Sequence, residues 1–471
     1  MSEEEMPICQ ALFNHVAKAR GPLHVPGHQQ GRTLPARLDL WLGQAAKLDL
    51  TELPGLDNLA QPEGCILQSQ ELAAKAYGSE MCLYSVNGSS AGIMAAILAT
   101  TTPDTTVLFA NPFHISAWHG LVHSGANALR AGAKYNADGR QGTVNLAALT
   151  SALDKHPEIG VVYVTSPTYL GDVSDIAAIS DQVHRRGLLL IVDEAHGAHF
   201  GLHPCLPQNS VQAGADIVIH SVHKMLPGLT QTAWIHSQGN RVDRARLAAS
   251  LRSLQSTSPS YLLLASLDAA QFWLRSEGPA AAERTLQRLQ RAGLWSRPGK
   301  GEPTQGDMLK HWVCAPTWEA ARELAHRLTT RGLYPEYVDT TGVLSILGLD
   351  ISDSTLTQYA DIVNQWKLDR DASPPGHTLP VTASRLAVST EMEGFAMRPR
   401  DTLLSKRAIV PLAQGEGRVL GEPLVPYPPG VPVLYPGQVL TAEWIGNMEA
   451  WHSQGREIHG IDRRGNVTVL A

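Results

Sequence analysis

Short apolar runs alternate with helical patterns between about residues 82 and 234. The runs are continuous rather than alternating, as in strands that are buried on both faces of a parallel sheet. They are CLYSV (82–86), TVLFA (106–110), GVVYVTS (160–166), GLLLIVDE (187–194), ADIVIHS (215–221) and TAWIHS (232–237). Because strand–helix–strand alternation implies right-handed crossovers, the pattern predicts an α/β fold with a large, doubly wound, mostly parallel sheet.

The segment SDIAAISDQVHRRG (174–187) illustrates the helical pattern between two of these runs. Ile176, Ile179 and Val183 fall on one face of a helix, which we expect to pack on the sheet. Ser174 is the expected N-cap, because its hydroxyl suits the first unpaired backbone N–H groups. Gly187 suits the left-handed conformation that often ends a helix.

Two polar stretches rich in Gly and Pro, at 296–307 and 369–380, predict domain boundaries. We therefore expect an N-terminal segment (1–45), a large domain (46–294), a small α+β domain (295–375) and a C-terminal domain (376–471). An amphipathic helix at about 317–331 is expected in the small domain.

Composition excludes several classes of function. The chain has 471 residues, with 38 Lys and Arg against 44 Asp and Glu, hence a formal net charge of −6. This balance lacks the excess of positive charge that is typical of nucleic-acid-binding proteins. No apolar run approaches the roughly 18 residues that a membrane span needs. The five cysteines form no CxxC pair, and the acidic start MSEEEM has no apolar core, so we expect a cytoplasmic protein.

Three motif matches suggest other chemistry. GSSAG (88–92) matches the GxSxG turn of α/β-hydrolases, with Ser90 as nucleophile. IVDEAH resembles a magnesium-binding acidic strand end, but the phosphate loop that this function requires is missing. His196, His199 and His203 lack the HExxH spacing and any cysteine companion, and such histidines are more often structural, so no metal site is expected.

One interpretation uses these fragments together. Lys224 follows the last residues of an apolar run, after Ser221 and His223. Asp193 ends the apolar LLLIVD run, where a carboxylate needs a cation or a donor. NGSSAG leads a strand into a helix, an arrangement whose backbone N–H groups bind an anion. A phosphate site, a buried aspartate and a strand-end lysine are the groups that pyridoxal phosphate requires.

At these residues the sequence resembles the prokaryotic ornithine/lysine/arginine decarboxylase family, in its short form without an N-terminal wing domain. The resemblance extends through most of the chain. Among the segments that carry it are PLHVPGHQQG (22–31), VNGSSAGI (86–93), VDEAHGAHF (192–200), SVHKMLPGLTQTA (221–233), LQSTSPSYLLLASLD (254–268) and VPYPPGVPVLYPG (425–437). DEAHGAH, SVHK and PYPPG are specific in combination, whereas single pieces would not be. It implies a pyridoxal-phosphate enzyme of fold type I, with a large sheet domain and a smaller α+β C-terminal region.

The resemblance implies a role for each site residue. Lys224 would bind the cofactor covalently, Asp193 would pair with its pyridine nitrogen, and His114 would stack on its ring. The phosphate would be surrounded by Gly88, Ser89, Ser90, Ser221 and His223, while Ala195 and His196 would lie beside the ring. Thr257 and Ser258 belong to a segment that reaches the partner subunit's site in such enzymes, so a homodimer or a larger homo-oligomer with its site at the subunit interface is implied.

The implied reaction is decarboxylation of lysine, arginine or ornithine to an amine and CO₂, as in polyamine biosynthesis. Either Lys224 or His196 would protonate the product carbon, and the sequence does not choose between them. Glu416 and Glu422 are candidates for binding the distal cation of the substrate, and His24 and His28 for lining the entrance.

Departures from the family pattern leave the substrate open. Gln29 and Gln30 replace a Lys-Gly pair, Ile115 replaces a lysine after His114, and Gln438 replaces a glutamate. Two alternatives follow. One is another fold-type-I reaction, such as an aminotransferase with Arg385 on the substrate carboxylate. The other is a catalytically weak homologue that acts as a regulatory partner.

Overall fold

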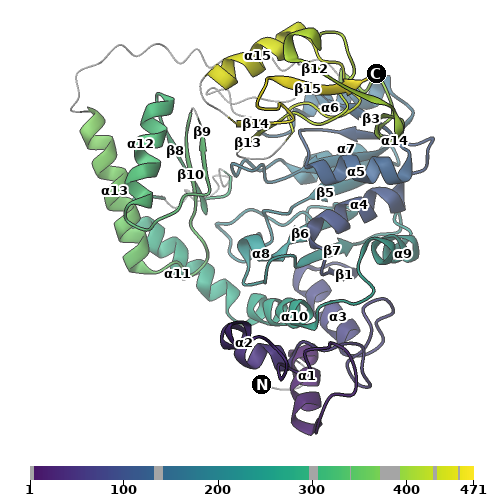
Figure 1. Cartoon of the computed structure of the whole chain (residues 1–471), viewed down its shortest axis with the longest axis vertical. Helices are drawn as coiled ribbons and strands as arrows, with labels where there is room; N and C mark the ends of the chain where they lie inside the picture. The colour runs from purple at the N-terminus through teal and green to yellow at the C-terminus, as the bar shows by residue number, and fades with distance from the viewer. Residues whose placement is uncertain are drawn as a thin grey trace. The chain divides into compact units, whose positions relative to one another are not determined.

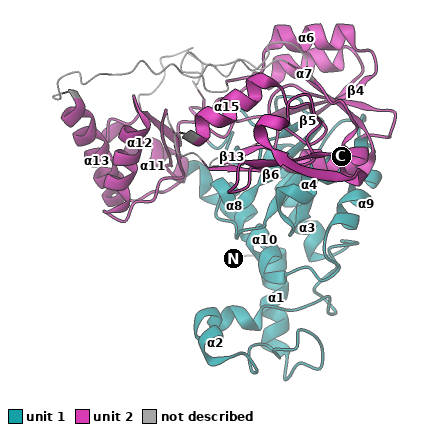
Figure 2. Cartoon of the chain, turned by 45° about the horizontal axis from the view of Figure 1, so that its top comes forward, with its two compact units in different colours: residues 1–100, 192–202, 208–280 teal, residues 101–191, 203–207, 281–471 magenta. Residues whose placement is uncertain are grey.

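The computed structural model describes residues 5–131, 142–295, 306–339, 341–371, 393–427, 432–453 and 457–471 (Figure 1). The chain divides into two compact units (Figure 2). Unit 1 comprises residues 1–100, 192–202 and 208–280, and unit 2 comprises residues 101–191, 203–207 and 281–471. The four-part division expected from the sequence stays a prediction.

The largest sheet has eight strands in the order β1-β7-β6-β5-β4-β2-β3-β11. Their bounds are β1 (Met81–Ser85), β2 (Thr106–Phe109), β3 (Asn127–Arg130), β4 (Ile159–Thr165), β5 (Leu189–Asp193), β6 (Ile217–Ser221), β7 (Ala233–Ser237) and β11 (Glu393–Gly394). β2 runs parallel to β3 and β4, whereas β7 runs antiparallel to both β1 and β6. The predicted α/β fold is confirmed, and each of the six apolar runs contains a strand.

Burial explains why these runs are continuously apolar. Every residue of β2, β5, β6 and β7 is buried. A strand covered on both faces has no solvent-facing positions, so its sequence does not alternate. β3 was not predicted, because its four residues alternate between buried and half-buried positions and form too short a run.

In unit 1, helices pack on the strands and on one another. α4 packs on β1, β6 and β7, and α9 packs on α4. The helices are α1 (Pro7–Lys18), α2 (Ala36–Leu42), α3 (Cys65–Tyr77), α4 (Gly88–Thr100), α8 (Val222–Met225), α9 (Arg244–Leu254) and α10 (Tyr261–Ser276), with a 3₁₀ turn at Gly43–Lys47.

Unit 2 contains three small sheets besides its share of the large one. They pair β8 (Lys310–Cys314) and β9 (Tyr337–Asp339) with β10 (Gly342–Ile346), β12 (Arg407–Pro411) with β15 (Asn466–Leu470), and β13 (Val425–Tyr427) with β14 (Glu457–His459). Its helices are α5 (Ile115–Ser124), α6 (Leu146–Lys155), α7 (Ile176–His184), most of α11 (Gly278–Arg291), α12 (Trp318–Thr329), α13 (Asp353–Asp371), α14 (Pro399–Leu404) and α15 (Ala442–Ser453). A separate apolar core that includes Leu420, Trp444 and Val469 holds the C-terminal strands and α15 together.

The predicted N-cap of α7 is wrong by one residue. Asp175, not Ser174, caps the helix, because its carboxylate accepts a hydrogen bond from the N–H of Ala178 at 3.0 Å. Ser174 is buried, and its hydroxyl accepts instead from the N–H of Val144 at 3.1 Å. Both residue types suit the cap position, so only the packing of Ser174 decides between them.

Gly92 is the point of closest approach between α4 and the sheet. A Cβ atom there would lie 2.7 Å from Cγ1 of Ile235 on β7. Gly92→Ala should therefore destabilise the protein by about 1–3 kcal/mol, the usual cost of overpacking a core. The measurement is the midpoint of thermal unfolding.

Gly446→Ala on α15 is the matched control, since a Cβ there would have no heavy atom within 4 Å. It should raise the midpoint, because alanine is favoured over glycine inside a helix by about 1 kcal/mol. A midpoint for Gly92→Ala at or above that of the wild type would contradict the close approach.

Candidate active site

The ends of β5 and β6 carry the polar residues that the sequence singled out in unit 1. Asp193 is the last residue of β5, and Ser221 is the last residue of β6. Lys224 lies on α8, the short helix that begins directly after Ser221. Nζ of Lys224 lies 2.9 Å from Nε2 of His196. The amine predicted to bind the cofactor is therefore in contact with a histidine predicted to lie beside the ring.

The carboxylate of Asp193 is held by the turn that follows it. Asp193 is 3% exposed, and its Oδ1 accepts a hydrogen bond from the N–H of Ala195 at 3.1 Å. Burial of a carboxylate at this depth is costly unless donors or a cation replace the lost hydration. The same turn continues to His196, so the position of the carboxylate and that of the imidazole depend on one short segment.

The first turn of α4 forms a potential anion site. Gly88 begins α4 after β1 and has a φ of +73°, a conformation that glycine adopts at little cost. Ser89 and Ser90 follow it, and the first N–H groups of a helix have no acceptor within the helix. The hydroxyl of Ser221 donates to Oγ of Ser89 at 2.7 Å. Such N–H groups with nearby hydroxyls suit a phosphate.

His223, also expected near the phosphate, is anchored through Nδ1, which donates to the carbonyl oxygen of Thr232 at 3.0 Å. Burial lowers the pKa of His223, so the protein alone favours the neutral imidazole. A phosphate close to Nε2 would favour the protonated form, because an opposite charge stabilises a cation.

A buried pair of ionisable groups lies directly after Asp193. Oε2 of Glu194 lies 2.7 Å from Nε2 of His220, and both side chains are almost fully buried. Oε1 of Glu194 accepts hydrogen bonds from the hydroxyl of Ser210 at 2.5 Å and from its N–H at 3.1 Å. The ring of His220 also packs on Tyr77, with centroids 4.7 Å apart.

Burial sets the protonation of this pair. It raises the pKa of Glu194 to about 8 and lowers the pKa of His220 to about 3. These shifts favour a neutral Glu194 and a neutral His220 near neutral pH, a state in which the O–H of Glu194 can donate to Nε2 of His220. A neutral Glu194 adds no negative charge to the turn after β5. Neither residue was a candidate from the sequence, although a polar group inside or directly after an apolar strand signals a need for a partner.

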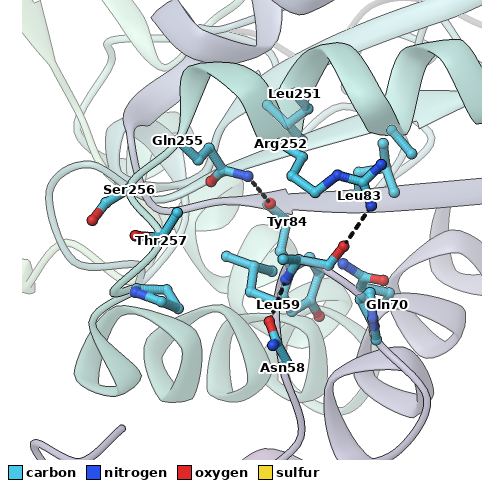
Figure 3. Close-up of a pocket in the computed structure, with 14 residues that line it drawn as sticks. Asn58, Leu59, Gln70, Leu83, Tyr84, Leu251, Arg252, Gln255, Ser256 and Thr257 are labelled. Carbon is cyan, nitrogen blue, oxygen red and sulfur yellow. Dashed lines mark hydrogen bonds between the residues drawn. The ribbon is translucent and has the colours of Figure 1, made fainter. Parts of the chain in front are cut away.

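Thr257 and Ser258 lie in the exposed segment between α9 and α10. Gln255 fixes the start of this segment, because its Oε1 accepts from the N–H of Val86 at 2.9 Å and its Nε2 donates to the carbonyl oxygen of Tyr84 at 3.4 Å. Figure 3 shows the pocket beside it, where Gln255, Ser256 and Thr257 lie opposite Asn58 and Leu59. Among the predicted cofactor contacts, Thr257 lines this pocket whereas Lys224 and Asp193 do not.

His114 belongs to unit 2, where it is the N-cap of α5. Its Nδ1 accepts a hydrogen bond from the N–H of Ser116 at 3.2 Å. The side chain is exposed, whereas the adjoining Phe113 is fully buried. Stacking of His114 on the cofactor ring stays a prediction.

The remaining candidates have local partners. Glu422 pairs with Arg407 at 3.3 Å, and Glu416 is exposed. Nε2 of His28 lies 3.1 Å from Asp49, and Nδ1 of His24 lies 2.7 Å from the carbonyl oxygen of Val25.

Of the three histidines weighed as metal ligands, His203 belongs to unit 2 and lies 2.6 Å from Glu283. Within the described ranges, no three His, Cys, Asp or Glu residues group as metal ligands. Arg385 and residues 428–430 of the PYPPG motif lie outside those ranges.

Comparison with known proteins places the chain in a family. Residues 6–293 match the model of the Orn/Lys/Arg decarboxylase major domain, and residues 387–464 match that of its C-terminal domain. The chain belongs to the Orn/Lys/Arg decarboxylase family. The resemblance seen in the sequence is thereby confirmed, and family and fold together indicate a decarboxylase with pyridoxal phosphate as its cofactor.

Relatives of the chain include decarboxylases named for different substrates. It is 30% identical to an arginine decarboxylase of Bacillus subtilis, over 94% of this chain and 93% of the relative. It is 24% identical to a lysine decarboxylase of Pseudomonas aeruginosa, over 92% of this chain and 74% of the relative. The structure of the E. coli constitutive lysine decarboxylase shares the fold, with a TM-score of 0.83 at 20% identity over 100% of this chain and 82% of that one. In the described parts of the chain, no helix has the length and apolar character to cross a membrane.

The Glu194–His220 pair predicts a specific pH dependence of stability. Unfolding returns the pKa of Glu194 from about 8 to its ordinary value of 4.5. Between these values the folded state keeps a proton on Glu194 that the unfolded state has released, so stability from this group falls as pH rises. The thermal midpoint of the cofactor-free wild type minus that of Glu194→Gln should therefore decrease between pH 4.5 and 8.

Glu71→Gln is the control, since Glu71 is an exposed carboxylate on α3 of the same unit. The midpoint of wild type minus that of Glu194→Gln could instead rise between pH 4.5 and 8, or follow the same course as the midpoint of wild type minus that of Glu71→Gln. Either result would show that Glu194 is ionised in the folded protein.

Proposed function

We propose that this protein decarboxylates a basic amino acid, with arginine as its preferred substrate, and releases the corresponding amine and CO₂. The observation that carries the proposal is the contact between Lys224 and His196, beside a buried Asp193, in a chain of the Orn/Lys/Arg decarboxylase family. Arginine is favoured over lysine and ornithine because a relative of similar length, 30% identical to this chain, is named an arginine decarboxylase. The product would be a precursor of polyamines.

The residues of unit 1 fit pyridoxal phosphate. Lys224 would bind the cofactor covalently, and Asp193 would hold a proton on its pyridine nitrogen, because a nearby anion favours the protonated form. The phosphate would bind at Gly88, Ser89 and Ser90, with Ser221 and His223 adjoining. When bound, the cofactor supplies the electron sink that loss of CO₂ requires. Ala195 would lie beside the ring, and His114 would stack on it.

The contact between Lys224 and His196 also supports a role in proton transfer. A 2.9 Å contact between two nitrogens requires that one donate and the other accept. A lysine ammonium has no acceptor, so in that form it donates to the lone pair on Nε2 of His196. The two groups would thus exchange a proton within the site, and either could deliver it to the product carbon.

We further propose that the protein acts as a homodimer or a larger homo-oligomer. Thr257 and Ser258 are exposed, as expected for groups that serve a neighbouring subunit. α2 has no buried residue, and it exposes 80% of Leu40 and 77% of Trp41. Contiguous exposed apolar side chains are typical of a surface that associates. A cytoplasmic location remains part of the proposal.

Two other functions remain as alternatives. A fold-type-I aminotransferase would need a cation for the substrate carboxylate, and a regulatory homologue would bind the cofactor without turnover. The lysine, the aspartate and the contacting histidine together favour a catalyst, because a binding partner has no need of a proton-transfer pair.

Reduction with borohydride tests the covalent role of Lys224. After incubation with pyridoxal phosphate and reduction, mass spectrometry of peptides should find the label on Lys224. Lys224→Ala should lose both the label and the visible absorbance of the bound cofactor, since no other amine would replace it. Lys75→Ala, which removes an exposed lysine on α3, is the matched control and should retain both. Labelling of a different lysine would overturn the assignment.

Release of CO₂ and amine tests the reaction and its substrate. Purified protein with pyridoxal phosphate should release both in equal amounts from arginine, and at least tenfold more slowly from lysine and ornithine. Faster release from lysine would reassign the substrate within the family. Transfer of the amino group to a 2-oxo acid without CO₂ would indicate an aminotransferase, and no turnover despite a labelled Lys224 would indicate the regulatory homologue.

A further inference from the structure

Tyr435 of the C-terminal region makes an unusual contact with the segment before α5. Its hydroxyl donates to the carbonyl oxygen of Phe113 at 2.5 Å and accepts from the N–H of the same residue at 3.1 Å. Both side chains are fully buried. One hydroxyl is thus hydrogen-bonded to both the N–H and the carbonyl group of Phe113. Buried backbone groups need such partners.

Ring packing strengthens this contact. The rings of Tyr435 and Phe113 stack with centroids 4.0 Å apart and an interplanar angle of 15°. Phe113 stacks in turn on Phe109, the last residue of β2, at 3.7 Å. The guanidinium of Arg130, at the end of β3, lies 5.5 Å from the centre of the Tyr435 ring. The hydroxyl contact is therefore backed by a continuous stack that reaches the sheet.

The residues that follow Tyr435 hold α5 at a second point. The carbonyl oxygen of Pro436 accepts a hydrogen bond from Nε1 of Trp118 on α5 at 3.0 Å. Oε1 of Gln438 accepts from the N–H of Tyr435 at 2.9 Å, and Gln438 is buried. Gln438, a departure from the family pattern, thus shapes the turn that presents Tyr435. Segment 435–438 contacts α5 both before its first residue and within its first turns.

His114 lies between these two points of contact. It follows Phe113 directly and caps α5 through Nδ1, while its side chain is exposed. An exposed ring on a backbone that is fixed on both sides is suited to present one face to a ligand. A shift of Phe113 by even a fraction of an ångström would move the ring, because His114 is the next residue of the chain.

We propose that Tyr435 is a positioning residue for His114, through which the C-terminal region controls how tightly the cofactor is held. The proposal rests on the assignment of His114, under the proposed function, as the residue stacked on the cofactor ring. Tyr435 itself needs no contact with cofactor or substrate. The C-terminal region therefore contributes to cofactor binding through the geometry of one loop.

A double-mutant cycle in the full-length protein tests this coupling. Tyr435→Phe keeps the ring stack but leaves the N–H and carbonyl groups of Phe113 without the hydroxyl. The dissociation constant for pyridoxal phosphate, from titration of the cofactor-free protein, should rise by about three- to tenfold, the equivalent of one lost hydrogen bond. The visible circular dichroism of the bound cofactor should change as well. In the His114→Ala background, Tyr435→Phe should leave the dissociation constant unchanged within twofold.

Two further variants keep the test decisive. Trp118→Phe removes the hydrogen bond to Pro436. It should raise the dissociation constant for pyridoxal phosphate by a smaller factor, and this rise should also disappear in the His114→Ala background. This variant replaces Tyr435→Phe in the test if Tyr435→Phe fails to fold. Tyr359→Phe is the matched control, because it removes another buried hydroxyl of unit 2, 2.7 Å from Nδ1 of His311 in the small domain. It should lower thermal stability without changing the cofactor affinity.

The outcomes separate the two proposals. An equal effect of Tyr435→Phe with and without His114, or no effect in the wild type while His114→Ala weakens binding, would overturn the positioning role alone. If His114→Ala itself leaves affinity and dichroism unchanged, the stacking role of His114 fails and the positioning role fails with it. Labelling of Lys224 by borohydride would be unaffected by either result.

Discussion

A carboxylate buried at the end of an apolar strand is the constraint on which the candidate site depends. Asp193 ends β5, where its side chain is buried, and the N–H of Ala195 in the following turn donates to its carboxylate. The same turn brings His196 to Lys224, so a single segment serves both the anion and the amine. Glu194 follows Asp193 and contacts His220, and burial raises the pKa of Glu194, which favours the neutral acid. Glu194 therefore adds no negative charge to this turn near neutral pH.

A second constraint acts on the backbone beside His114, within unit 2. His114 caps α5 in unit 2, and its backbone is fixed from the C-terminal region through Phe113 and Tyr435. The C-terminal region thereby fixes the backbone directly before His114. The same set of contacts includes Gln438, whose side chain accepts a hydrogen bond within a buried turn rather than serving as a charge.

Much of the large sheet could be predicted from the sequence, because strands buried on both faces appear there as continuous apolar runs. Lys224, Asp193 and Ser221 could also be placed at or just after strand ends, because a polar residue that interrupts or follows an apolar run stands out in the sequence. Local choices were less certain. Ser174 and Asp175 both suit a helix cap, and only the buried contact of Ser174 with Val144 leaves the cap to Asp175. β3 lacked the continuous apolar run by which the other strands were found.

Six strands of the large sheet, the polar residues at their ends and, by resemblance, the decarboxylase family could be inferred from the sequence alone. Those features depend on hydrophobic period and on motifs, which are properties of neighbouring residues. Tertiary packing fixed the antiparallel direction of β7 and the contacts of Lys224 with His196, of Glu194 with His220 and of Tyr435 with Phe113. These three contacts join residues 26 to 322 positions apart, and no local pattern specifies a partner at such a distance, because packing selects it.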